Sequence, residues 1–287
     1  MKVLKKIINK IIRQTIGGHL QIGNFNLKIY RGQNLPFVLA KYPDYGQNLV
    51  RLAKIIEQKY SPLKIFDIGS NIGDTIAMLL SSNPDYKILS VEGDDKYLKI
   101  LKQNFGDNKS VYIYNNFLGD QNKTINQSIS RTGGTLKINP QESHEIINLI
   151  TLDTLLEKEP EKQEVKLLKI DTDGYDNQIL RGAKSYLEKT KPVIYFEYDT
   201  KFLKENGENG LEIFSYLEVS GYQTVAFFDN YGRFLISLDI TDKEKLQQLD
   251  HYINSRNGAF AYYDIVIFHQ QDQDLAKSFI SKEEKRF

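Results

Sequence analysis

Carboxylate side chains stand at the ends of four predicted strands in this chain of 287 residues. Asp67 and Glu92 end the first and second strands. Asp171 and Asp173 follow the fourth strand, and Glu197 ends the fifth. In an open parallel sheet, ligands bind in the crevice outside the carboxyl ends of the strands. Because this crevice would be lined by acids, it favours a ligand with positive charge and hydroxyl groups over a phosphate.

The loop after the first strand reads FDIGSNIGD over residues 66–74. A dinucleotide loop that begins at Gly69 needs a glycine at position 71, where the backbone approaches a pyrophosphate. This chain has Asn71 there, and its second glycine is Gly73. Asparagine tolerates a left-handed backbone, so the turn can form without glycine at that position. Glu92 follows Gly69 by 23 residues, close to the offset of an acid that binds ribose hydroxyls.

S-adenosylmethionine has the groups that such a crevice could bind, namely a sulfonium, an α-ammonium and a ribose diol. Its carboxylate could use the helix N-terminus that follows Gly73. We therefore predict a site for this methyl donor at the strand ends. The predicted donor-binding residues are Asp67, Gly69, Ser70, Asn71, Gly73, Asp74, Glu92, Gly93, Leu118 and Asp171.

A second motif, VKLLKIDTDGYDNQILRGA at residues 165–183, resembles the signature of the FkbM-type methyltransferases. DIGSNIGD is similar to the first loop of that family, and VEGDD at 91–95, LDTLL at 152–156 and residues 193–197 follow in the same order. The resemblance implies a doubly wound, mostly parallel seven-stranded sheet of the Rossmann-like class I methyltransferase fold. It also implies binding of S-adenosylmethionine and methylation of a hydroxyl oxygen, with sugars, glycan chains or natural products as acceptors.

This chain departs from the family pattern at three positions. Asp173 and Asp176 stand where the family usually has glutamate, so each carboxylate is shorter by one methylene. Gly93 stands where a proline often follows the ribose-binding glutamate. Acidity is retained, so we expect the activity to be retained with altered contacts to the acceptor.

Asp171, Asp173 and Glu197 are the candidate catalytic residues. Methyl transfer from a sulfonium is an in-line displacement that benefits from positioning, and a weakly acidic alcohol must also lose a proton to a base. Two alternatives remain open for these acids. Asp171 and Asp173 could cap the next helix or pair with Lys169 and Arg181, or all three acids could hold a divalent cation that lowers the pKa of the hydroxyl.

Alternation of strands and helices from about residue 64 to 197 would position these side chains. This alternation predicts a parallel sheet with helices on both faces. Two segments joined by a turn at 229–232 and a last strand at 262–268 predict an antiparallel end to the sheet. Residues 117–153 are additional material between the third and fourth strands. The first five predicted strands are 64–67, 86–91, 111–116, 163–170 and 193–197.

The pattern divides the chain into a basic N-terminal extension at 1–47, a methyltransferase domain at 48–270 and a C-terminal tail at 271–287. No acid precedes Asp44, whereas eight basic residues do. Apolar residues at helical spacing predict an amphipathic helix at 2–16 with a basic polar face. It could pack on the body, pack on another subunit in a homodimer, or lie on an anionic membrane as a peripheral contact.

Composition excludes several classes of protein. The chain has no cysteine, so it has no disulfide, thiolate metal site or cysteine nucleophile. Its four histidines are scattered, and no apolar run reaches the ~18 residues of a membrane span. No signal peptide is recognisable, so we expect a cytoplasmic location. Basic residues do not cluster in the α/β body, so we do not expect nucleic acid as a partner.

These observations predict an S-adenosylmethionine-dependent O-methyltransferase that methylates a hydroxyl of a saccharide, glycan or related small metabolite. One alternative is a nicotinamide-dependent oxidoreductase on a similar sheet, which Asn71 disfavours. Another is a catalytically inactive partner protein that binds S-adenosylmethionine. The retained Glu92 and Asp171 count against this last alternative.

Overall fold

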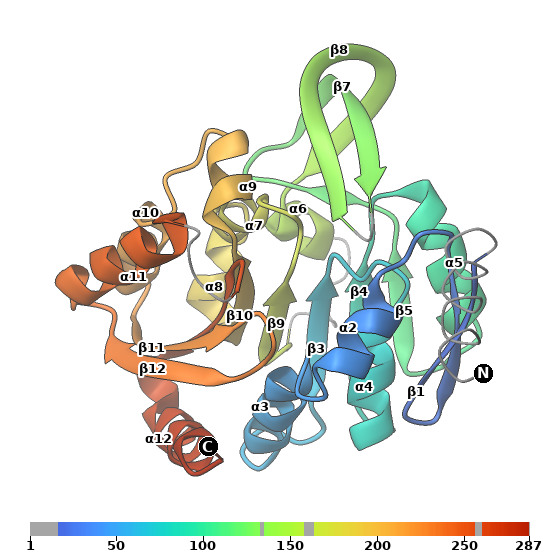
Figure 1. The fold of residues 1–287 in the computed structure, drawn as a ribbon. Helices are drawn as coiled ribbons and strands as arrows, with labels where there is room; N and C mark the ends of the chain where they lie inside the picture. Colours follow the sequence, from blue (N-terminus) through green and yellow to red (C-terminus); the bar gives the residue numbers. More distant parts are fainter. Residues whose placement is uncertain (1–16, 133–134, 158–163, 256–259, 287) are drawn as a thin grey trace.

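The computed structural model describes residues 17–132, 135–157, 164–255 and 260–286, which Figure 1 shows as a ribbon. The predicted helix at 2–16 lies outside this part of the chain. A central sheet of eight strands has helices on both faces. The prediction of a doubly wound α/β fold is therefore confirmed.

The central sheet has the strand order β12-β11-β13-β10-β9-β3-β4-β5. Strands β10, β9, β3, β4 and β5 run parallel, and β13 lies antiparallel between β10 and β11. The sheet has eight strands instead of the predicted seven because β12 pairs with β11 and adds an edge. The strands are β3 (Lys64–Ile68), β4 (Lys87–Val91), β5 (Val111–Tyr114), β9 (Leu167–Ile170), β10 (Val193–Tyr198), β11 (Tyr222–Asp229), β12 (Phe234–Asp239) and β13 (Tyr263–His269).

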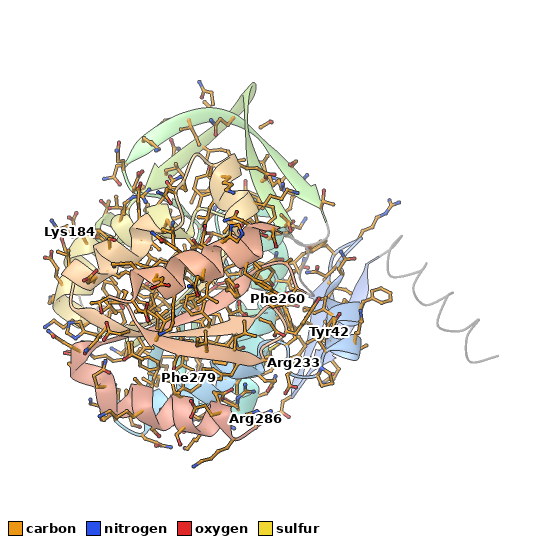
Figure 2. The ribbon with its side chains drawn as sticks, turned by 60° about the vertical axis from the view of Figure 1, so that its left-hand side comes forward. Tyr42, Lys184, Arg233, Phe260, Phe279 and Arg286 are labelled. Carbon is orange, nitrogen blue, oxygen red and sulfur yellow. The ribbon has the colours of Figure 1, made fainter. Side chains whose placement is uncertain are left out.

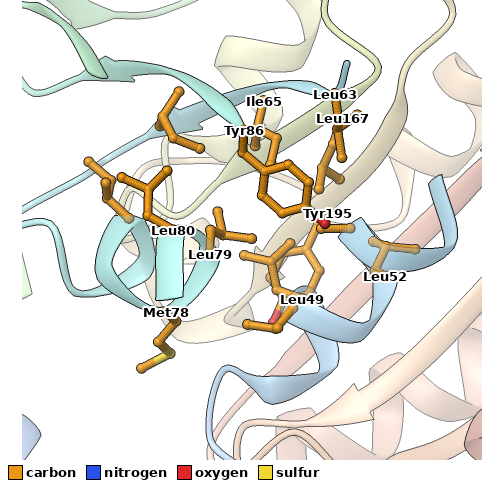
Figure 3. Close-up of a cluster of buried hydrophobic side chains, with 14 of the residues drawn as sticks. Leu49, Leu52, Leu63, Ile65, Met78, Leu79, Leu80, Tyr86, Leu167 and Tyr195 are labelled. Carbon is orange, nitrogen blue, oxygen red and sulfur yellow. The ribbon is translucent and has the colours of Figure 1, made fainter. Parts of the chain in front are cut away.

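Buried side chains form one apolar layer on each face of the sheet, because successive strand residues point to opposite faces. Ile65 packs in the layer that contains Leu49 of α3 and Leu79 of α4 (Figure 3). Its neighbour Phe66 packs in the opposite layer, with residues of α7, α8 and α10. The helices between α2 and α11 are α2 (Leu35–Lys41), α3 (Gln47–Glu57), α4 (Asp74–Ser82), α5 (Asp95–Phe105), α6 (Leu152–Glu157), α7 (Asp176–Arg181), α8 (Lys184–Thr190), α9 (Thr200–Glu205), α10 (Glu212–Val219) and α11 (Lys243–Ser255).

The additional residues 117–153 form a three-stranded sheet with the order β6-β8-β7. Its strands β7 and β8 are antiparallel and stay paired up to Thr132 and Thr135. This hairpin stands over the carboxyl ends of the central strands (Figure 1). The strands are β6 (Phe117–Leu118), β7 (Lys123–Thr132) and β8 (Thr135–Ile150).

The described part of the N-terminal extension is a hairpin of β1 (Gly18–Ile22) and β2 (Phe25–Ile29), followed by α2. Asn104 of α5 joins this hairpin to the domain, because its Oδ1 accepts a hydrogen bond from Lys28 N at 2.8 Å. Its Nδ2 donates to Ile72 O, also at 2.8 Å, in the loop after β3. Among the described residues, no helix is long and apolar enough to cross a membrane.

The prediction of a C-terminal tail is wrong for most of residues 271–287. A short 3-10 helix η2 (Gln270–Asp272) leads into α12 (Gln273–Glu284). Phe279 of α12 is buried beneath the sheet, with its ring 5.8 Å from that of Phe228 (Figure 2). Four apolar residues at helical spacing form this face, and the charged residues on either side of them hid it in the sequence. Those four residues are Leu275, Ala276, Phe279 and Ile280.

Candidate functional site

Two cavities meet at the carboxyl ends of the central strands. The smaller cavity has a volume of about 600 Å³ and lies between the ends of β3 and β4 and the β7–β8 hairpin. The larger cavity, of about 1790 Å³, extends towards α3, β10 and β13. Gly69, Asn71, Asp171 and Asp173 line both cavities. A ligand could therefore occupy the two cavities on either side of these four residues.

The loop between β3 and α4 has the backbone that its sequence predicted. Gly69, Asn71 and Gly73 all have positive φ, and the φ of Asn71 is 49°. This confirms that asparagine adopts the left-handed conformation at position 71. At Gly69 a Cβ atom would lie 1.9 Å from the carbonyl oxygen of Asp171, so only glycine allows the loop to approach β9 so closely. At Gly73 a Cβ atom would meet the Phe105 ring at 2.5 Å.

Glu92 is buried and lines the smaller cavity. Its Oε2 accepts a hydrogen bond from Asn71 N, and its Oε1 accepts one from Asp94 N, both at 2.8 Å. Burial raises the pKa of Glu92 to about 7, and these two hydrogen bonds oppose the shift. A carboxylate oxygen has lone pairs for more than one donor, so each oxygen can also accept a ligand hydroxyl.

Apolar side chains from several elements close the smaller cavity. Gly93 lies against the Phe117 ring, where a Cβ atom would be only 2.5 Å from the ring carbons. Leu118 lines the wall, but β8 and α7 also contribute, and the sequence did not indicate these elements. The added apolar residues are Leu136, Ile138, Leu149, Tyr175 and Ile179.

Asp67 and Ser70 line neither cavity, in contrast to the prediction that they contact the donor. Asp67 is fully buried and forms an ion pair with Lys169, with 2.9 Å between Oδ1 and Nζ. The Ser70 hydroxyl donates to the carbonyl oxygen of Asp67 at 2.6 Å. In the pairing of β3 with β9, Asp67 lies beside Lys169. Both side chains therefore support the loop from below.

Lys169 lines the larger cavity, and sequence reasoning treated it only as a partner for Asp171 or Asp173. Its Nζ donates to the carbonyl oxygen of Gly69 at 3.2 Å and lies 3.6 Å from Asp171 Oδ2. The alternative that Asp171 pairs with Lys169 is therefore confirmed. Arg181 instead pairs with Glu208, at 2.6 Å.

Asp171 and Asp173 differ in their surroundings although both line the two cavities. The side chain of Asp171 is 49% exposed. Asp173 has a positive φ of 53°, and its Oδ2 accepts a hydrogen bond from Leu136 N of the hairpin at 2.7 Å. Burial, together with the charge of Asp171, raises the pKa of Asp173 to about 8. Neither acid caps α7, whose N-cap residue Tyr175 makes no side-chain cap.

Glu197 is buried in the wall of the larger cavity. Burial and the charges of Asp171 and Asp173 raise its pKa well above the usual range, and its side chain shares a hydrogen bond with Asp171. Asp74 lies in the same cavity, and burial raises its pKa to about 6. In the described part of the chain, no group of three or more acidic or histidine side chains has an arrangement that could hold a metal ion.

Sequence reasoning missed Tyr195, Tyr262 and Asp264, which also line the larger cavity. Asp264 of β13 lies beside Glu197 of β10 in the antiparallel pairing. Burial raises the pKa of Asp264 to about 7, while hydrogen bonds with Tyr195 and Asn48 oppose the shift. No signal in the sequence could have found this residue, because it lies far from Glu197 along the chain.

The β7–β8 hairpin is tied to both sides of the smaller cavity. Arg131 of β7 forms an ion pair with Asp94, and its Nε donates to Asp94 Oδ2 at 2.8 Å. Asp94 is buried and caps α5 by accepting from Lys96 N and Tyr97 N. On the other side, Leu136 N donates to Asp173. The hairpin therefore covers the cavity while it contacts the residues after β4 and β9.

The strand order and the cavities at the strand ends are those of a doubly wound α/β fold that binds a ligand at the carboxyl ends of its strands. Residues 67–224 match the methyltransferase FkbM domain, which is more than half of the chain. The chain therefore belongs to the FkbM methyltransferase family. This confirms the prediction of an S-adenosylmethionine-dependent methyltransferase and disfavours the nicotinamide alternative.

Solved structures resemble the chain at low sequence identity. Methyltransferase FkbM from Methylobacillus flagellatus KT is 16% identical, with a TM-score of 0.41 over 56% of this chain and 39% of that chain. The match thus spans well under half of that relative. A TehB-like S-adenosylmethionine-dependent methyltransferase from Corynebacterium glutamicum ATCC 13032 Kitasato is 11% identical, with a TM-score of 0.41 over 82% of this chain and 100% of that chain. A search of curated proteins found no match.

Proposed function

We propose that the protein transfers a methyl group from S-adenosylmethionine to a hydroxyl oxygen of a saccharide, glycan or related hydroxylated metabolite. The observation that carries this proposal is the pair of cavities that share Gly69, Asn71, Asp171 and Asp173. Methyl transfer needs a donor and an acceptor on opposite sides of one small region, so that the reacting atoms can align.

The smaller cavity suits the adenosyl part of the donor. Glu92 would accept hydrogen bonds from the ribose hydroxyls, and Gly93 lets the Phe117 ring pack against the backbone beside it. The apolar wall around Leu118 and Ile138 suits the adenine ring. On the side of the larger cavity, Asp74 and the N-terminus of α4 would face the amino acid part of the donor.

Asp171 is our candidate for the general base. It lines both cavities, and about half of its side chain is exposed, so an acceptor hydroxyl can reach it. The donor supplies an electrophilic methyl group on its sulfonium. As the oxygen–carbon bond forms and the carbon–sulfur bond breaks, the hydroxyl proton would pass to Asp171, leaving a methyl ether and S-adenosylhomocysteine.

Polar and aromatic groups in the larger cavity support a hydroxylated acceptor. Tyr45, Tyr195 and Tyr262 supply aromatic faces and phenol groups in its wall. Aromatic rings with a polar end suit a ring that presents both C–H faces and hydroxyls. The carboxyl groups of Glu197 and Asp264 add hydrogen-bonding capacity for hydroxyl groups.

Calorimetric titration tests the donor part of the proposal. We expect S-adenosylmethionine to bind and NAD not to bind at millimolar concentration. Glu92→Gln should weaken donor binding about tenfold or more, because an amide nitrogen cannot accept from a ribose hydroxyl and charge-assisted hydrogen bonds contribute about 1.5–3 kcal/mol. Asp85→Asn is a matched control, since Asp85 is exposed at the other end of β4. Unchanged donor binding in Glu92→Gln would contradict the assignment.

A further inference from the structure

The larger cavity contains more carboxyl groups than its own cations can neutralise. Two lysines line it, and both are already paired with acids. Lys169 Nζ lies 2.9 Å from Asp67, and Lys201 Nζ lies 3.9 Å from Glu205. The acids that line the cavity are Asp74, Asp171, Asp173, Glu197, Asp199 and Asp264.

Glu197 is an independent indication of a ligand. It is 7% exposed, it faces the cavity, and it shares a hydrogen bond with the carboxyl group of Asp171. Asp199 provides a contrast, because its Oδ1 accepts from Lys201 N at 2.8 Å and caps α9. Two carboxyl groups that share a hydrogen bond must hold a proton between them, because both cannot be ionised so close together. A cationic ligand group could take the place of that proton.

Asp264 gives this cation a second carboxylate in a fixed position. It lies beside Glu197 in the pairing of β13 with β10, and Tyr195 and Asn48 hold its carboxyl group by hydrogen bonds. Asn48 Nδ2 in turn donates to the Tyr195 hydroxyl at 3.1 Å. Two carboxylates on neighbouring strands can share one ammonium group, which has three donors.

Aromatic side chains near these acids favour a ring-shaped acceptor that carries the cation. Tyr45, Tyr231 and Tyr262 line the same cavity. Tyr231 is held by stacking on Tyr42, with ring centroids 3.6 Å apart. Tyrosine faces attract both cations and the C–H faces of sugar rings. An acidic sugar would instead be repelled by the surrounding carboxylates.

We propose that the acceptor is an amino sugar or a similar cyclic amino polyol, whose ammonium group binds between Glu197 and Asp264. This inference rests on the proposed function and specifies its acceptor. The ammonium group would orient the ring so that a hydroxyl faces Asp171. Glu197 then acts as a specificity-determining residue and not as the base.

Calorimetry on the protein saturated with S-adenosylhomocysteine tests the charge preference directly. The probes are D-glucosamine, D-glucose and D-glucuronic acid, which share a pyranose ring and carry a positive, zero and negative charge near neutral pH. We expect glucosamine to bind at least about tenfold more tightly than glucose. Hydrogen bonds to charged groups contribute more free energy than hydrogen bonds between neutral groups, and the difference corresponds to about this factor in affinity. We expect glucuronic acid to bind more weakly than glucose.

Two isosteric variants connect this preference to the proposed residues. Glu197→Gln and Asp264→Asn should each reduce the preference for glucosamine over glucose to less than about threefold, while S-adenosylhomocysteine affinity stays within about threefold. Glu188→Gln is the control, because Glu188 is an exposed acid of α8 that does not line the cavity. It should keep the full preference.

Equal affinities for the three probes, a preference for glucuronic acid, or no detectable binding of glucosamine would overturn the inference. So would a glucosamine preference that survives in both variants. These outcomes are separate from failure of the proposed function, which would show as failure of S-adenosylmethionine and S-adenosylhomocysteine to bind. Normal binding of S-adenosylhomocysteine without a charge preference would overturn this inference alone.

Discussion

Asp171 and Asp173 are two residues apart in the sequence but suit different tasks. Asp173 is engaged by Leu136 N and has a pKa of about 8, because it is buried beside Asp171. A carboxyl group that is largely protonated near neutral pH is a poor proton acceptor. Asp171 is half exposed and lies 3.6 Å from the Lys169 ammonium, so an acceptor hydroxyl can reach its carboxyl group. Asp171 is therefore the better candidate for the base.

Replacement of Asp171 separates catalysis from donor binding. In Asp171→Asn we expect kcat to fall about 10²–10⁴-fold, the contribution typical of a positioned base. The affinity for S-adenosylhomocysteine should change by less than about threefold, because an amide can replace the carboxylate as a wall of the cavity. Single-turnover kinetics and calorimetry measure the two quantities. Asp173→Asn should lower kcat by much less, and equal losses in the two variants would contradict this assignment.

The β7–β8 hairpin is the element that completes the smaller cavity. Strand β8 pairs with β7 and with β6, and this pairing sets the conformation of the hairpin. The position of the hairpin over the site depends on contacts with other elements. Arg131 holds one side to the buried Asp94, and Leu136 N holds the other side to Asp173. The hairpin supplies Leu136 and Ile138 to the wall, so a displaced hairpin would open the adenosyl part of the site.

Loss of the Arg131–Asp94 ion pair should weaken donor binding. In Arg131→Ala we expect the affinity for S-adenosylmethionine to fall about tenfold, because a partly buried Arg–carboxylate contact contributes about 1.5–3 kcal/mol. Calorimetry and limited proteolysis of the hairpin would measure the effect. Lys137→Ala is a matched control on the same hairpin. It removes an exposed ion pair with Glu205 at 2.7 Å, and such surface pairs contribute only about 0–1 kcal/mol.

At the scale of the whole molecule, the fold concentrates acids in one buried region. Burial places several carboxyl groups away from water, so ionising any one of them costs free energy. Each ionised group also makes the ionisation of its neighbours less favourable. Lys169 is the buried cation among them, and it is already paired with Asp67. Glu197 has a strongly raised pKa. Five further carboxyl groups have raised pKa values, namely Asp74 at about 6, Glu92, Asp176 and Asp264 at about 7, and Asp173 at about 8.

These shifts predict how stability depends on pH. The usual pKa values of these five carboxyl groups are 3.8 or 4.5, so between about pH 4 and 8 the folded state binds more protons than the unfolded state. The free energy of unfolding should therefore fall as pH rises through this range. His269 has a lowered pKa and acts in the opposite direction, but it is one group against five. The lowered pKa values of Asp239, Asp242 and Asp274 act below this range.

Thermal unfolding of the ligand-free protein at pH 5 and pH 8 would measure this dependence, and we expect a higher Tm at pH 5. Asp173→Asn removes a carboxyl group whose pKa is raised to about 8. It should raise stability at pH 8 by about 0.5–2 kcal/mol, the range usual for a stabilising substitution, and by less at pH 5. A Tm that is higher at pH 8 in the unmodified protein would contradict the argument.

Much of the fold and part of the site could be predicted from the sequence. Alternating strands and helices indicated the sheet, since their periodicity is a local property of the chain. The positive φ of Asn71 and the position of Glu92 in the cavity followed from a short turn and one crossover. These features depend on residues that are close to one another in the sequence, so a short stretch of sequence is enough to predict them.

Only the tertiary structure decided the contacts between segments that are far apart. It placed Asp67 below the cavity because β3 pairs with β9 beside Lys169, and it brought Asp264 next to Glu197 through the pairing of β10 with β13. It also packed α12 under the sheet and the β7–β8 hairpin over the strand ends. The reason is that burial and electrostatic environment depend on strand order and packing. The sequence by itself determined which acids stand at the strand ends, and the fold decided which of them meet a ligand.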